Sequence, residues 1–207
     1  MLIHRIAAIA VLGLCTSLSA SAQTAAQHPA GGPPPDNSGI APGSQVDPAK
    51  SFDAAVTGLE KLWMGAANAM PADKYSFAPS KAIFVPTQAV KFDTVRTYAQ
   101  LVTHTIVANY GYFSRIGGIK PDVDINAINN LTSKDDIVKA LAATFVFAYK
   151  AVANVTTANA FESLRGPQTR ATALAGAIAH GEDEYGQAVE YLRMNAIIPP
   201  ASAPREP

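Results

Sequence analysis

The stretch AIAHGEDEYGQAVEYLRMNAIIPP (residues 177–200) decides the fold of this chain. Its apolar residues fall at helical spacing, and the Pro-Pro pair at its end stops a helix from continuing. Asn195, shortly before those prolines, is a natural C-cap. Read as a helix, the stretch places His180 and Glu184 four residues apart, so both side chains project from the same face. The sequence therefore predicts a helix over about residues 168–194 that carries two candidate ligands.

Three more segments show apolar residues at helical spacing. They span about residues 48–69, 89–116 and 133–152. No convincing strand pattern appears between these segments. Because all four segments are about five turns long or more, they predict an all-α protein with a four-helix bundle over residues 48–200.

The two ends of the chain have a different composition. Arg5 is followed by an apolar run and by Ala-Ser-Ala, which predicts a secretory signal peptide over residues 1–22. Residues 23–47 hold a GGPPP run and few apolar residues, which is typical of a disordered tether. Residues 201–207 predict a flexible tail. We therefore expect a periplasmic or secreted protein, without a membrane anchor once the signal is cleaved, because no second apolar segment is long enough.

Charge and cysteine content exclude several classes of function. The chain has 16 Lys+Arg against 16 Asp+Glu and no run of basic residues, so it lacks the electrostatic footprint of a nucleic-acid-binding protein. Its one cysteine, Cys15, lies in the predicted signal peptide, so the mature chain has no disulfide and no thiol nucleophile. Histidine, aspartate and glutamate are left as metal ligands. The motifs of a di-iron carboxylate bundle and of c-type haem are missing.

His104 and His180 are the histidines of the predicted helical region, and each lies among apolar neighbours on a different helix. Together with Glu184 they predict a site for a divalent metal ion, because two histidines and one carboxylate leave coordination positions open for water or substrate. A second interpretation stays open. Each histidine could hydrogen-bond a neighbour in the core, and His180 with Glu184 could form a solvated surface pair.

Three further residues are candidates for contact with the ligands or for the lining of a pocket. Asp183 and Tyr185 flank Glu184, and Tyr110 belongs to an aromatic cluster on the second helix. The alternative is that the tyrosines pack in the core with a solvated hydroxyl and that Asp183 is a surface charge. No cofactor other than a metal ion is predicted.

Three segments resemble the DinB/YfiT-like family in the correct order: PADKYSFAP (residues 71–79), LVTHTIVANYGYF (residues 101–113) and YGQAVEYLRMNAIIPP (residues 185–200). The resemblance implies a four-helix bundle with up-down-down-up topology. It also implies a metal ion (zinc, nickel or iron) held by one histidine of the second helix and a His-x-x-x-His pair of the fourth. His104 and His180 match the first two positions, and Glu184 stands where the family usually has its third histidine.

Characterised members of the family include thiol-dependent transferases and isomerases, and members often pair through helix faces. The resemblance thus implies a metal-dependent enzyme of hydrolase or thiol-dependent transferase type, acting on a small molecule and capable of forming a homodimer. The glutamate at the third ligand position keeps a second function open. In that alternative the chain is a metal-free ligand-binding or stress-response bundle that has lost the third histidine.

Overall fold

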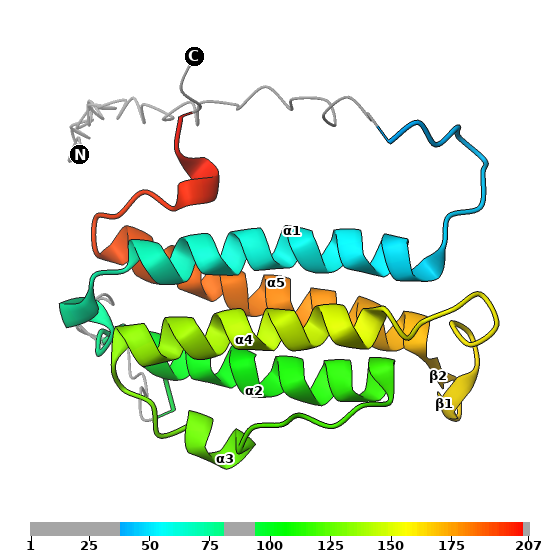
Figure 1. The fold of residues 1–207 in the computed structure, drawn as a ribbon. Helices are drawn as coiled ribbons and strands as arrows, with labels where there is room; N and C mark the ends of the chain where they lie inside the picture. Colours follow the sequence, from blue (N-terminus) through cyan, green and yellow to red (C-terminus); the bar gives the residue numbers. More distant parts are fainter. Residues whose placement is uncertain (1–37, 81–93, 205–207) are drawn as a thin grey trace, which may run out of the picture. The chain divides into compact units, whose positions relative to one another are not determined.

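The structure is a computed structural model that describes residues 38–80 and 94–204. By its internal contacts the chain divides into two units, Met1–Ala41 and Pro42–Pro207. The described residues of the first unit, 38–41, are exposed and contain no helix or strand. The second unit is mainly helical, and Figure 1 labels its helices and strands. The prediction of an all-α protein is confirmed.

Helix α1 (Pro48–Ala69) begins where the sequence supplies a helix start. The Asp47 carboxylate accepts a hydrogen bond from the backbone N–H of Lys50, and Pro48 occupies the first turn, where its missing N–H costs nothing. The buried face of α1 consists of residues at helical spacing: Phe52, Val56, Leu59, Trp63, Ala66 and Ala67. The predicted bounds of this first helix are confirmed.

Helix α2 (Tyr98–Gly117) begins later than the sequence pattern predicted. The expected start was near residue 89, but residues 94–97 are not helical, and residues 89–93 lie outside the described part. A capping box sets the start. Thr97 Oγ1 accepts from the N–H of Gln100, and Gln100 Oε1 accepts from the N–H of Thr97, at 3.2 and 2.8 Å. These bonds satisfy N–H groups that a helix end leaves unpaired. They set the helix start at Tyr98, although apolar residues at helical spacing continue upstream.

The short helix α3 (Ile125–Ile128) precedes helix α4 (Lys134–Val152). The predicted start of α4 is confirmed, because the Ser133 side chain accepts from the N–H of Asp136. Lys134 connects the start of α4 to the end of α1. Its ammonium donates to the carbonyl oxygens of Asn68 and Met70, both at 2.8 Å, and so satisfies acceptors that the end of α1 leaves unpaired.

Helix α5 (Arg170–Met194) follows a small antiparallel hairpin of β1 (Ser163–Arg165) and β2 (Gln168–Thr169). The sequence predicts no strand here, because strands of three and two residues are too short to show an alternating pattern. The hairpin moves the start of α5 two residues past the predicted one, and the predicted C-cap at Asn195 is confirmed. The 3₁₀ helices η1 (Ala72–Lys74) and η3 (Pro200–Ser202) complete the described elements.

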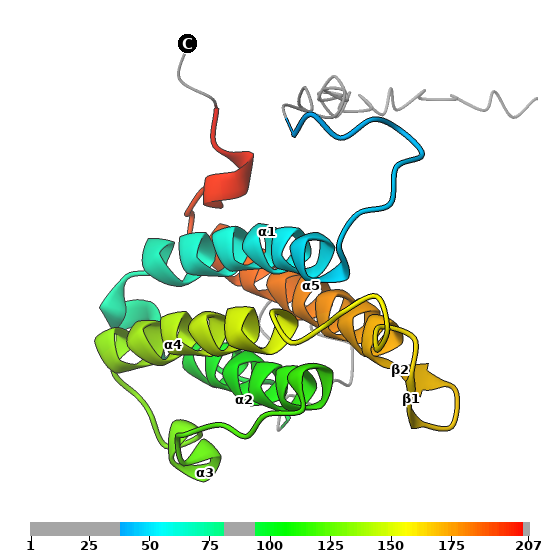
Figure 2. The same cartoon turned by 45° about the vertical axis from the view of Figure 1, so that its right-hand side comes forward.

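The four long helices pack around one apolar core. Helices α1 and α2 each lie against both α4 and α5, as the views of Figures 1 and 2 also indicate. The helices contribute large, fully buried side chains to the same cluster: Trp63, Leu101, Ile106, Phe113, Leu141, Phe145 and Leu192. The site described below lies between α2 and α5.

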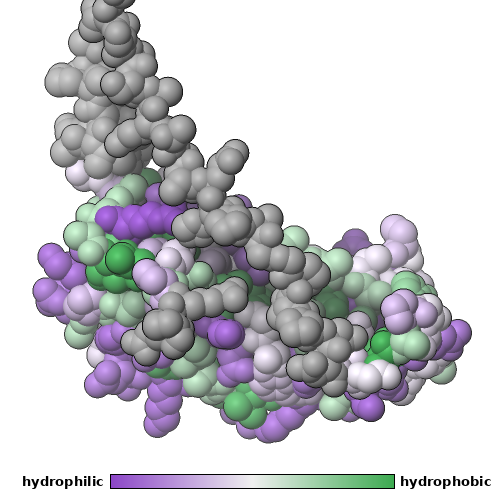
Figure 3. All heavy atoms as spheres, turned by 90° about the horizontal axis from the view of Figure 1, so that it is seen from above, coloured by the Kyte–Doolittle hydropathy of each residue, from purple (hydrophilic) through white to green (hydrophobic). Residues whose placement is uncertain are grey.

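Several large apolar side chains of the described residues are exposed: Ile40, Val46, Val123, Val146, Phe161, Met194 and Ile198. On the face shown in Figure 3, hydrophilic and hydrophobic residues alternate. In the part of the chain that the structure describes, no helix has the length and apolar character to cross a bilayer. The predicted signal peptide (residues 1–22), residues 23–37 of the predicted tether and residues 205–207 of the predicted tail lie outside the described residues. Residues 38–47 are exposed and have no regular structure, and η3 packs near Gly65 of α1.

Gly117 permits the close approach of α2 and α4, which gives a first prediction. A Cβ atom at this position would lie 2.6 Å from Cα and 2.7 Å from Cβ of Ala151, and neither atom can rotate away. We expect Gly117→Ala to lower the free energy of unfolding by about 1–3 kcal/mol. Urea unfolding followed by circular dichroism measures the change.

Gly111→Ala, in the same helix, is the matched control. A Cβ at Gly111 meets nothing within 4 Å, and the residue is exposed. Because alanine has a higher helix propensity than glycine, the free energy of unfolding of this variant should rise by about 0.5–1 kcal/mol. A similar change in both variants would mean that the contact with Ala151 does not limit the helix separation.

Candidate metal centre

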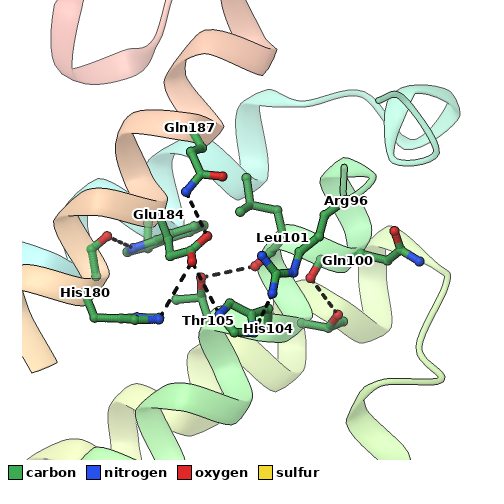
Figure 4. A network of polar contacts seen from close by, with 11 residues as sticks. Arg96, Gln100, Leu101, His104, Thr105, His180, Glu184 and Gln187 are labelled. Carbon is green, nitrogen blue, oxygen red and sulfur yellow. Dashed lines mark hydrogen bonds and ion pairs between the residues drawn. The ribbon is translucent and has the colours of Figure 1, made fainter. Parts of the chain in front are cut away.

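Three side chains that the sequence analysis singled out converge between α2 and α5. His104 comes from α2, and His180 and Glu184 come from one face of α5 (Figure 4). The Nε2 atoms of the two imidazoles lie 3.3 and 3.7 Å from the same carboxylate atom, Glu184 Oε1. The two rings are 5.4 Å apart, and one potential ligand atom from each residue lies within 4.8 Å of the other two. The predicted three-residue cluster is therefore present.

A tight contact between α1 and α5 fixes the position of this cluster. The Trp63 indole N–H donates to the carbonyl oxygen of Gly181 at 2.9 Å, and Trp63 is fully buried. A Cβ atom at Gly181 would lie 2.6 and 2.8 Å from the methyl carbons of Leu59. Because Gly181 directly follows His180, this contact sets the depth and the rotation of the turn of α5 that carries His180.

The spacing of the ligand atoms fits a metal ion with short bonds. Bonds of about 2.0–2.1 Å in a tetrahedral arrangement place neighbouring ligand atoms about 3.4 Å apart. The observed separations of 3.3 and 3.7 Å from Nε2 of each histidine to Glu184 Oε1 lie close to this value. Both separations that involve Glu184 therefore match those around a bound ion, and all three candidate ligand atoms lie within 4.8 Å of one another.

The Glu184 carboxylate is more deeply buried than the members of a surface ion pair. The residue is 6% exposed, and no lysine or arginine of the described residues lies within ion-pair distance of it. Gln187 donates from Nε2 to Glu184 Oε2 at 3.3 Å, which leaves Oε1 facing the histidines. A buried carboxylate without a cation is costly, and a divalent ion at Oε1 would supply the missing charge. The interpretation of His180 and Glu184 as a solvated pair is wrong.

His104 presents a neutral imidazole to this carboxylate. Burial lowers the pKa of His104 below its usual value, and the nearby Arg96 guanidinium lowers it further. The Glu184 carboxylate acts in the opposite direction and is outweighed. The 3.3 Å contact is therefore better described as a hydrogen bond from a neutral ring than as an ion pair, and neutral imidazole is the form that binds metals.

The environment of His180 differs from that of His104. Its Nδ1 atom is buried and has no hydrogen-bond partner among the described residues. The ring contacts that of Tyr112 at a centroid distance of 5.8 Å, and its Nε2 faces Glu184. If His180 were an ordinary core histidine, its Nδ1 atom would need a hydrogen-bond partner in the protein. The described residues offer none.

The three other candidates point elsewhere. Tyr110 packs against Phe147 of α4 at 5.1 Å, and Tyr185 makes an edge contact with Trp63 at 6.2 Å. Asp183 is exposed. None of the three makes a hydrogen bond, ion pair or ring contact with the ligand cluster in the described part of the chain, so the packing and solvation alternatives describe them better.

Three residues that the sequence analysis missed surround the cluster. Gln187 orients the Glu184 carboxylate, Trp63 fixes the adjacent turn, and an Arg96 guanidinium nitrogen lies 3.5 Å from Nδ1 of His104. The i,i+3 spacing of Glu184 and Gln187 could have indicated the first. No pattern could have indicated Arg96 or Trp63, because their contacts depend on how separate elements pack.

Comparison of the sequence with family models and with curated proteins found no match. The class of the protein therefore follows from its own geometry: a mainly helical protein in which two histidines and one glutamate lie close enough together to bind a metal ion.

The low pKa of His104 predicts the pH dependence of stability. The unfolded chain binds this proton more readily than the folded protein does, so stability is fully present above the unfolded pKa and falls as the pH drops through the folded value. An NMR titration of the metal-free protein should place the pKa of His104 below that of a histidine in a peptide. His104→Gln should lose less stability than wild type between about pH 7.5 and pH 5. A pKa at or above the usual value would contradict the lowering that we attribute to partial burial and to Arg96.

Gln187 should affect metal affinity without binding the ion. Gln187→Met removes the hydrogen bond to Glu184 Oε2, and losing such a partner typically lowers metal affinity about 10–100-fold. Asp183→Asn is the matched control, because Asp183 is exposed beside Glu184, and we expect it to change the affinity by less than about threefold. Competition with a chromogenic chelator measures both. Equal losses would show that general charge around α5, and not orientation of the carboxylate, determines the affinity.

Proposed function

We propose that this protein is a metal-dependent enzyme in which His104, His180 and Glu184 hold one divalent cation. The observation that carries the proposal is the convergence of both Nε2 atoms on the single buried oxygen Glu184 Oε1. Zinc fits best, because two histidines and one glutamate form a known catalytic zinc set. Nickel and iron remain candidates, because imidazole ligands suit both.

Each side chain of the proposed centre has a definite task. The two imidazoles supply neutral nitrogen ligands, and the Glu184 carboxylate supplies negative charge that burial keeps from being screened. Gln187 holds the other carboxylate oxygen and so keeps Oε1 directed at the histidines. An ion with three protein ligands keeps a position for water or a thiol and lowers the pKa of that group. This favours a hydrolase or a thiol-dependent transferase acting on a small molecule.

We further propose that the chain is similar to the DinB/YfiT-like family in fold and in site. In Figure 1, α1 and α5 run from right to left while α2 and α4 run from left to right, which supports an up-down-down-up bundle. The ligands come from α2 and α5, the second and fourth long helices, as the resemblance implies. The family's activities and its pairing into homodimers remain proposals for this chain, as does export directed by residues 1–22.

One observation favours the metal-free alternative. The 3.3 Å distance from His104 Nε2 to Glu184 Oε1 is also short enough for a direct hydrogen bond, so the cluster can close without an ion. In that case the three residues are a structural link between α2 and α5, and the protein binds its ligand without a metal ion. Metal content separates the two functions.

The test is metal binding by the full mature chain, purified without a histidine tag and without chelator. Wild type should bind one zinc or cobalt ion per chain, and cobalt should give the absorption of a four- or five-coordinate site. His104→Ala and Glu184→Ala should lose this binding, whereas Glu184→His should keep it, because histidine is the residue that the resemblance implies there. Tyr110→Phe is the control, since Tyr110 packs against Phe147.

The outcomes are distinct. No uptake by wild type, combined with uptake by Glu184→His, would mean that the fold persists without its metal and that the metal-free alternative holds. Equal uptake by wild type and His104→Ala, with both proteins folded by circular dichroism, would place the ion elsewhere.

A further inference from the structure

A polar pocket of about 430 Å³ adjoins the metal centre at His104. The imidazole stands between the two, because its Nε2 faces Glu184 while its Nδ1 faces Arg96 (Figure 4). The volume is within the range of small-molecule sites. The pocket is formed by the segment before α2, the first turns of α2 and the end of α3: Thr94, Val95, Arg96, Gln100, Thr103, His104 and Asn129.

The lining of this pocket favours a ligand with one negative charge. Among the described residues that line it, Arg96 carries the permanent charge, and none is a carboxylate. Gln100 uses its carbonyl oxygen in the capping box, so its NH₂ group is the side-chain donor that this lining residue has left. Asn129 and Thr94 add a neutral amide and a hydroxyl. One guanidinium with neutral donors around it matches a carboxylate, which it binds through two parallel hydrogen bonds.

Arg96 is available for such a ligand and is held in place. Among the described residues no carboxylate lies within ion-pair distance of it, and its guanidinium contact is the 3.5 Å approach to His104 Nδ1. Its backbone is fixed on both sides. The Tyr191 hydroxyl donates to the Arg96 carbonyl oxygen at 2.9 Å, and Thr97, the next residue, caps α2. The guanidinium can therefore move while its Cα atom stays in place.

The contact between Arg96 and His104 competes with metal binding. Arginine has no acceptor atom, so a hydrogen bond from it requires a lone pair on Nδ1 and places the imidazole hydrogen on Nε2. A metal ion at Nε2 requires the opposite tautomer, with N–H on Nδ1 facing the guanidinium donors. Because two donors then face each other, metal binding releases Arg96 toward the pocket.

We propose that this pocket binds the carboxylate group of the substrate, that Arg96 recognises it, and that metal and carboxylate binding strengthen each other. The inference rests on the proposed metal centre and names the substrate class for it, a small molecule with a carboxylate group. Metal binding breaks the hydrogen bond between Arg96 and His104 and so frees the guanidinium for the carboxylate. Carboxylate binding draws Arg96 away from His104 and so frees the imidazole for the metal ion. By linkage, the factor by which zinc raises carboxylate affinity equals the factor by which carboxylate raises zinc affinity.

The experiment uses acetate as the probe and acetamide as its neutral counterpart, on full-length protein in zinc-loaded and metal-free forms. NMR chemical shifts of the Arg96 side chain and isothermal titration report binding. We expect acetate, and not acetamide, to bind, with at least fivefold higher affinity in the zinc-loaded form. Arg96→Gln should weaken acetate binding at least tenfold in both forms. Arg165→Gln is the matched control, because it removes the same charge from the exposed β1 strand and should leave acetate affinity unchanged.

A second readout follows from the competition at His104. Without acetate, Arg96→Gln should bind zinc more tightly than wild type does, because the opposing contact is gone. Acetate binding that is the same in wild type and Arg96→Gln would overturn the proposal, since the anion would then bind the metal ion directly or bind elsewhere. If wild type takes up no zinc, the proposed metal centre fails; acetate binding that still depends on Arg96 in the metal-free protein would nevertheless support the carboxylate pocket.

Discussion

The close contact of α1 with α5 at Gly181 is the constraint on which the site depends. The Trp63 indole binds the carbonyl oxygen of this residue, and Leu59 fills the space that any side chain there would need. The backbone of α5 is therefore held from behind at the residue after His180. With α5 fixed in depth and rotation, His180 and Glu184 face α2, where His104 completes the cluster. A packing contact with no polar group of the site in it thus sets the geometry of the candidate metal ligands.

The burial of Glu184 connects stability with function. A carboxylate that is 6% exposed and faces the neutral imidazole of His104 gives little stability to the metal-free protein, because no lysine or arginine of the described residues offsets its lost hydration. The same burial strengthens its interaction with an ion that arrives later. The hydrogen bond from Gln187 is consistent with this role, because it orients the carboxylate without neutralising its charge. A cluster built only to join two helices would be expected to carry a permanent charge partner.

Helical periodicity accounts for what the sequence predicted and for what it missed. The i,i+4 spacing of His180 and Glu184 and the inward stripe of α2 with His104 depend on local geometry alone, so these parts of the site were predictable. Tyr110 lies six residues after His104, or about 240° around the helix, which explains its contact with α4 instead of the ligands. The helix start at Tyr98 depends on a capping box, and the start at Arg170 depends on a capping box and the preceding hairpin. The spacing of apolar residues does not indicate either feature. Arg96 acts through tertiary contacts, which one sequence does not reveal.

Lys134 has a consequence for how the protein opens locally. Its ammonium joins the carbonyl oxygens of Asn68 and Met70 to the first residue of α4, across 66 and 64 positions of the chain. Helix ends normally fray independently, with opening free energies near zero. Here opening of the last turn of α1 breaks both hydrogen bonds of Lys134, so we expect amide hydrogen exchange at the two helix ends to be coupled. The loop segment between α1 and α2 consequently starts from a fixed point, Met70, rather than from a fraying helix end.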